Sequence, residues 1–140
     1  MGAARIIDSH IHCGVQHSDL PFAEIAPLLG EAGITDACLF APVEDIYDRD
    51  DYDFQDNTHW QQARRAANHY LLDLADAGQA LFPYLFVWTD FAVEELRRPY
   101  RGIKWHPHSA APAYHYDHPR SGRLPAEPTP LRLPVVLEES

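Results

Sequence analysis

The sequence of 140 residues lacks any apolar run near the ~20 residues that a membrane-spanning helix needs. It also lacks the hydrophobic core of a secretory signal peptide, because Asp8 and His10 interrupt the apolar stretch near the N-terminus. Cysteine is scarce, and Cys13 and Cys38 form neither a CxxC pair nor a disulfide framework, which favours a reducing compartment. A cytoplasmic protein is therefore expected.

Basic residues are also few. The 11 Lys and Arg against 21 Asp and Glu leave a formal net charge of −10 at pH 7. Nucleic acids and anionic membranes attract basic surfaces, so neither is expected as a partner, and a small-molecule substrate is. What is present is a globular composition, 46% hydrophobic and 11% aromatic. At this length we expect a single domain over residues 1–140.

Residues 6–12 (Ile-Ile-Asp-Ser-His-Ile-His) predict a short strand with an apolar start and a polar end. Because strand side chains alternate, Asp8, His10 and His12 are expected on one face. Neutral imidazole suits zinc, so we interpret His10 and His12 as a metal-binding pair, with Asp8 orienting an imidazole. The alternative is a strand edge with two solvated histidines. Cys13 is either a site thiol or a small buried residue.

The rest of the chain alternates between predicted helices and strands. Helical spacing is found over residues 22–32, where Pro27 kinks or shortens the helix, and over 57–77 and 91–98. Predicted strands cover residues 34–41, 81–88, 102–106 and 134–139. Strict alternation predicts an α/β fold with a parallel sheet and right-handed crossovers.

The segment 42–56 is a long acidic loop. A calcium loop is excluded by its spacing, because the sixth position counted from Asp48 is Asp53 rather than glycine and the twelfth is His59. We interpret the segment as a solvated lid or substrate loop. His59 and His69 belong to the next predicted helix and are interpreted as surface or hydrogen-bonded residues rather than ligands.

A second polar strand end follows at residues 102–108 (Gly-Ile-Lys-Trp-His-Pro-His), where Lys104 and His106 share one face. A lysine inside a parallel sheet must be paired, deprotonated or modified, because a lone buried ammonium is costly. Carbamylation by carbon dioxide would turn Lys104 into a carboxylate that can bridge two metals. An ion pair with Asp8 or Glu138 is the alternative, and both stay open.

These two segments, an early helix and a later Leu-Pro-Val-Val-Leu strand resemble the amidohydrolase superfamily, and within it the amidohydrolase-2 branch of metal-dependent hydrolases. The resemblance implies a TIM-type barrel with one or two divalent ions, zinc or manganese, at the C-terminal strand ends. There an activated water attacks an amide, ester or lactone, or a carboxylate is lost. On this resemblance His10 and His12 match metal ligands, and Lys104 matches a bridging carbamylated lysine of some branches. Lys104 and His106 are the catalytic candidates, although His106 has no fixed role across the branches.

Two departures from the family pattern set further expectations. Glu138 stands where many members have a histidine ligand, and a carboxylate still suits zinc or manganese, so Glu138 is a candidate ligand. The family's general-base aspartate would lie beyond residue 140, and a whole barrel of this kind needs ~250 residues. Three prolines also forbid a crossover helix over most of the segment before the last strand: Pro125, Pro128 and Pro130.

We therefore expect an incomplete TIM-type barrel of about five strands that is not a stable monomeric enzyme. Completion by another copy of the chain is one way to cover its edges. The alternative to a hydrolase is a catalytically silent remnant that binds metal or a partner. A third alternative is a binding domain without metal, in which the histidines only form hydrogen bonds.

Overall fold

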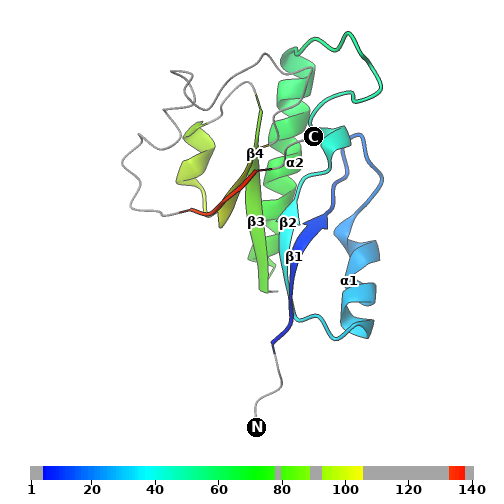
Figure 1. Cartoon of the computed structure of the whole chain (residues 1–140), viewed down its shortest axis with the longest axis vertical. Coiled ribbons are helices and arrows are strands. Elements are labelled where there is room, and N and C mark those ends of the chain that lie inside the picture. The colour runs from blue at the N-terminus through cyan, green and yellow to red at the C-terminus, as the bar shows by residue number, and fades with distance from the viewer. Residues whose placement is uncertain (1–4, 78–79, 89–92, 106–132, 138–140) are drawn as a thin grey trace.

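The computed structural model describes residues 5–77, 80–88, 93–105 and 133–137 (Figure 1). Its elements in chain order are β1 (Ile7–His12), α1 (Phe22–Glu31), β2 (Asp36–Phe40), the 3-10 helix η1 (Val43–Asp45), α2 (Thr58–Asp76), β3 (Ala80–Val87), the 3-10 helix η2 (Val93–Arg97), β4 (Gly102–Trp105) and β5 (Val135–Leu137). Among the described residues, no helix has the length and apolar character needed to cross a membrane.

The five strands form one parallel sheet in the order β1-β2-β3-β4-β5. The sheet curls through 214°, which makes it a half-barrel that resembles part of a TIM-type barrel. The predicted α/β class and incomplete barrel are thus confirmed. The helix predicted at residues 91–98 is shorter and tighter than expected, since the described part is a 3-10 helix over Val93–Arg97.

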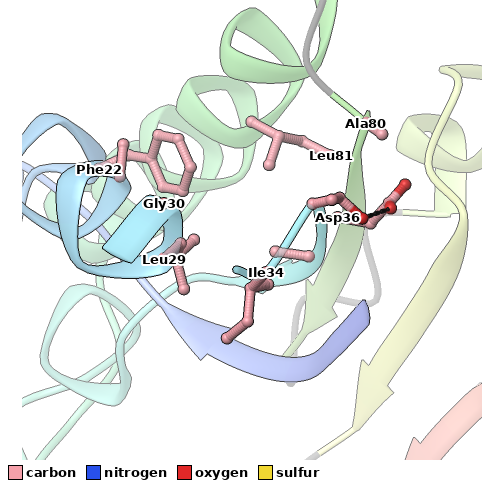
Figure 2. A pocket seen from close by; sticks show the side chains of 10 residues that line it. Phe22, Leu29, Gly30, Ile34, Asp36, Ala80 and Leu81 are labelled. Carbon is pink, nitrogen blue, oxygen red and sulfur yellow. Dashed lines mark hydrogen bonds between the residues drawn. The ribbon is translucent and has the colours of Figure 1, made fainter. Parts of the chain in front are cut away.

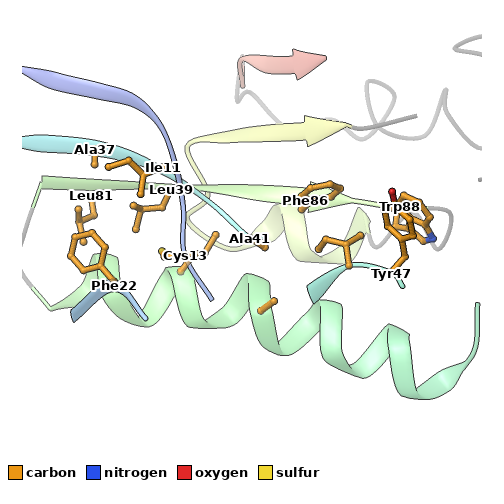
Figure 3. Close-up of a cluster of buried hydrophobic side chains, with 13 residues drawn as sticks. Ile11, Cys13, Phe22, Ala37, Leu39, Ala41, Tyr47, Leu81, Phe86 and Trp88 are labelled. Atoms are coloured by element: carbon orange, nitrogen blue, oxygen red, sulfur yellow. The ribbon is translucent and has the colours of Figure 1, made fainter. Parts of the chain in front are cut away.

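The main core lies between the helices and one face of the sheet (Figure 3). Leu39 and Ala41 from the second strand region meet Ala67 and Leu71 of α2, and all four are fully buried. Burying a leucine side chain contributes about 1.5–3 kcal/mol, so this layer holds α2 firmly on the strands. We call the opposite face of the sheet, which the helices do not cover, the inner face.

A buried amide joins α2 to β3. Asn68 donates from Nδ2 to the carbonyl oxygen of Phe86 at 3.1 Å and accepts at Oδ1 from the Phe86 backbone N–H at 2.9 Å. The register between β2 and β3 ends at Leu39 and Pro83, so Phe86 lies beyond the paired part of β2. Asn68 therefore satisfies main-chain groups that the neighbouring strand does not reach.

The acidic loop differs from the solvated segment that was expected. Its first part forms η1, after which Ile46 and Tyr47 are buried, and the Tyr47 ring stacks on Trp88 with centroids 4.8 Å apart. Residues 48–53 are exposed, as are Glu44, Gln55 and Asp56, so the solvated interpretation holds for these parts of the loop. The role of this loop as a lid stays a prediction.

One side chain of α2 holds the acidic loop at two points. Arg64 is buried and donates to both carboxylate oxygens of Asp56 at 2.9 and 2.7 Å. Its guanidinium also donates to the carbonyl oxygen of Ile46 at 3.0 Å. Since bidentate arginine–carboxylate pairs are among the stronger polar contacts, this arrangement fixes the acidic loop at Ile46 and at its end, Asp56.

Candidate metal centre

His10 and His12 lie at the C-terminal end of β1 and gather around Phe40 of β2. The ring centroids of His10 and His12 are 4.4 and 5.9 Å from that of Phe40. Phe40 alternates with Leu39 and Ala41, which face the helices, so Phe40 and the two imidazoles lie on the inner face. The structure thus brings both predicted ligands together at the strand end where barrel enzymes carry their sites.

The two imidazoles point their Nε2 atoms at each other, 2.9 Å apart. Nδ1 of His12 lies 3.0 Å from the carbonyl oxygen of Ala41. A carbonyl only accepts, so Nδ1 carries the proton and the neutral His12 ring presents a lone pair at Nε2. Two nitrogens bound to one tetrahedral ion at about 2.0–2.1 Å would be roughly 3.3 Å apart, so a small rotation of the rings fits the pair to one ion.

Lys104 of β4 reaches the same place. Its side chain is 0% exposed, and its Nζ lies 3.4 Å from Nε2 of His10 and 5.3 Å from the ring centroid of Phe40. The lysine is therefore inside the half-barrel, where the sequence placed it. An ammonium would repel a divalent cation at this distance, so the deprotonated or carbamylated form of Lys104 is the one compatible with a metal.

Asp8 does not take the place expected for it. Asp8 pairs with Ala37 and His12 pairs with Phe40, so β1 uses one residue more than β2 over this stretch, and the register shifts between Asp8 and Ile11. Ala37 and Phe40 point to opposite faces, so the prediction that Asp8 and His12 share a face is wrong. Asp8 instead accepts at Oδ1 from the backbone N–H of His10 at 3.0 Å.

Two aromatic residues of the site were missed by sequence reasoning. Phe40 is only 1% exposed and lies under both histidines and Lys104, and its ring centroid is 4.7 Å from that of Tyr84. Tyr84 in turn covers Gly102, where an added Cβ would lie 2.1 Å from the tyrosine ring. The glycine at the start of β4 was the available signal, whereas Phe40 was hidden in a strand that is apolar on both faces.

The two thiols differ in their surroundings. Cys13 is fully buried, and burial, followed by the charge of Asp45, raises its pKa to about 12. Burial also raises the pKa of Cys38, which is only half buried, against the lowering effect of its hydrogen bond with Tyr84. A raised pKa keeps a thiol protonated near neutral pH, which favours the buried-residue alternative for Cys13.

We expect a thiol reagent at pH 8 to label native protein once, at Cys38, and to label Cys13 only after unfolding. The reason is that reaction needs an accessible thiolate, and Cys13 offers neither access nor charge. Mass spectrometry of the labelled chain measures this. The variant Cys38→Ser should stay unlabelled when folded and react once in denaturant, and rapid labelling of the folded variant would contradict the burial of Cys13.

The remaining candidates lie outside the described residues. His106 and Glu138 both fall there, so the catalytic and ligand roles predicted for them stay predictions. Within the described ranges, no group of three or more His, Cys, Asp or Glu side chains is placed to hold a metal ion. The structure therefore unites His10, His12 and Lys104, and a third ligand of those types does not join them from the described part of the chain.

A cavity of about 300 Å³ lies at the other end of the sheet, between α1 and the first residues of β2 and β3 (Figure 2). Its lining is mostly apolar, with Phe22, Leu29 and Leu81 pointing inward. The carboxylate of Asp36 at its rim accepts from Nε of Arg5 at 2.8 Å and is satisfied there. This cavity opens at the N-terminal strand ends and takes no part in the histidine site.

Comparison with models of known protein families, with curated proteins and with solved structures finds no match. The resemblance to the amidohydrolase superfamily therefore depends on the sequence motifs. What the structure itself establishes is the parallel, curled half-barrel with His10, His12 and Lys104 on its inner face.

Proposed function

We propose that this chain is a metal-dependent hydrolase of the amidohydrolase type, in which His10 and His12 hold one divalent ion, zinc or manganese. The observation that carries the proposal is the convergence of three nitrogen atoms, Nε2 of His10, Nε2 of His12 and Nζ of Lys104, on the inner face at the C-terminal strand ends. When bound there, a divalent ion would supply Lewis-acid polarisation of a carbonyl and a lowered pKa of water.

The chain's own groups support such a centre in two ways. The Ala41 carbonyl holds the His12 proton on Nδ1, which leaves Nε2 as the donor atom, as main-chain and carboxylate partners do at metal-binding histidines. The Phe40 ring packs against His10 and Lys104, and of these two side chains Lys104 is 0% exposed whereas His10 is exposed to solvent. Burial of Lys104 strengthens the electrostatic contacts that this side chain makes.

Lys104 could supply a further metal ligand to this site. Lys104 is the single lysine of the sequence, beside ten arginines. Arginine stays charged in proteins, whereas a buried lysine can lose its proton and react, so a lysine serves this position where an arginine would not. Neutral Nζ adds to carbon dioxide with formation of an N–C bond and release of one proton, and the product is a carbamate with two ligand oxygens. The substrate is an amide, ester or lactone.

A second candidate is a metal-binding protein without turnover. It is favoured by one observation, namely that the described residues offer no third His, Cys, Asp or Glu at the site. A centre with two imidazoles and no acidic partner would bind an ion weakly and lack a general base.

The two candidates separate in one experiment. Purified protein is first analysed for metal and then assayed on ester and lactone panels with zinc or manganese supplied. We expect one equivalent of metal and hydrolysis that disappears with a chelator and returns with the ion. Metal without turnover on any substrate would favour the silent candidate, and absence of metal at saturating zinc would leave the histidines as hydrogen-bonding groups only.

A further inference from the structure

We propose that the two ends of the curled sheet bind each other across two copies of the chain, with β1 of one copy beside β5 of the other. These two strands are outermost in the sheet order (Figure 1). Both expose apolar side chains: Ile7 on β1 is 49% exposed, and Val135 and Leu137 on β5 are 49% and 50% exposed. Outer strands with exposed apolar residues are templates for pairing with another chain.

The apolar exposure is gathered at these two ends rather than scattered. The β1–α1 end also exposes Ile6, Val15, Leu20 and Leu28, the last of them by 62%. Among the large hydrophobic residues exposed in the described part of the chain, only Tyr52 lies elsewhere, in the acidic loop. Several exposed apolar residues at one end of a sheet favour an interaction surface there, whereas single exposed residues are ordinary.

The parallel sheet favours a second copy of the chain as the partner of its two outer strands. All five strands are parallel, so the outer edge of β5 in one copy can receive β1 of another copy and continue the sheet in the same direction. The arc of 214° covers more than half a turn, and a twofold axis along the barrel would join both pairs of ends at once. That closure leaves no edge open, whereas a one-sided contact would propagate into a filament.

Pairing of the ends has one consequence for the curvature of each half-barrel and another for the salt dependence of association. A ten-stranded barrel turns less per strand than this arc does, so each copy must open slightly as the ends pair. The net charge of −10 makes the copies repel each other. Salt screens that repulsion and strengthens apolar contacts, so association should tighten as ionic strength rises.

Sedimentation equilibrium of the whole chain tests the proposal without reference to activity. We expect a dimer whose dissociation constant falls with added salt. Ile7→Lys, and separately Val135→Lys with Leu137→Lys, should each weaken association at least ~10-fold, because a lysine on an outer strand blocks pairing. Tyr52→Lys is the matched control, since Tyr52 is 98% exposed and belongs to the acidic loop rather than to an outer strand, and it should leave association unchanged.

Cross-linking then identifies which edges meet. In a Cys38→Ser background, Ile7→Cys mixed with Val136→Cys should give an interchain disulfide, because Ile7 pairs with Asp36 and Val136 with Lys104, which places both side chains on the inner face. Neither variant should cross-link with itself. The proposal is wrong if the chain stays monomeric at every protein and salt concentration. It is also wrong if the lysine substitutions leave the dissociation constant of the dimer unchanged, or if Ile7→Cys cross-links with itself. Circular dichroism of each variant, compared with Tyr52→Lys, shows that loss of association is not loss of fold.

Discussion

Replacing His10 and His12 together with alanine is expected to abolish stoichiometric metal binding. Their Nε2 atoms face each other at 2.9 Å, so they would bind the same ion, and the double variant removes both donors. Losing only an outer partner of a ligand costs about 10–100-fold in metal affinity, so losing two ligands should cost at least ~100-fold, or about 2.7 kcal/mol. Elemental analysis after gel filtration and calorimetric titration with zinc measure the effect.

A histidine elsewhere in the fold provides the control. His69 on α2 lies with Nε2 2.8 Å from Oε2 of Glu95, away from the inner face, so His69→Ala should keep the full metal content. The single variants His10→Ala and His12→Ala should each fall between the control and the double variant. Full metal content in the double alanine variant would refute the assignment of these residues as ligands.

Lys104→Met is expected to weaken metal binding by about 10–100-fold and to remove hydrolysis while the fold remains stable. Methionine fills a similar volume under the same 0% exposure, but it cannot become a carbamate. The ion-pair alternative predicts a different result. Breaking a buried pair costs about 3–5 kcal/mol, so Lys104→Met would then lower the free energy of unfolding strongly. Urea unfolding together with metal titration distinguishes the two.

The carbamate itself can be observed because the sequence has a single lysine. Protein supplied with carbon-13 bicarbonate should show one carbamate resonance that is absent from Lys104→Met, and the N-terminal amine is the one other primary amine to check. In Lys104→Ala, added short carboxylic acids should restore part of the metal affinity by occupying the vacated space. A carbamate-free protein with full metal content and activity would show that Lys104 acts in another way.

Much of this fold could be predicted from local pattern. Strict alternation of helices and apolar strands is enough to specify parallel pairing, because a strand, a helix and a strand in sequence cross over in one hand and direction. The same reasoning placed His10 and His12 at a strand end and Lys104 inside the sheet, where it is 0% exposed. These outcomes depend on neighbours within a few residues, and a sequence displays those directly.

Other features were decided only by contacts between distant segments. The register shift in β1 moved Asp8 away from the face of His12, because alternation holds only while a strand is unbroken. The partner of His12 is the carbonyl oxygen of Ala41, and no residue type in a sequence indicates where a backbone carbonyl will point.

The acidic loop shows the same limit. Its composition indicates solvent exposure, yet Ile46 and Tyr47 are buried, because α2 and Trp88 offer them an apolar surface that forms only when the chain folds. Phe40 likewise contacts both His10 and Lys104 only because the sheet curls, which brings side chains of β1 and β4 to the same ring. Strand parity and composition are local properties, whereas these contacts depend on how far the whole sheet bends.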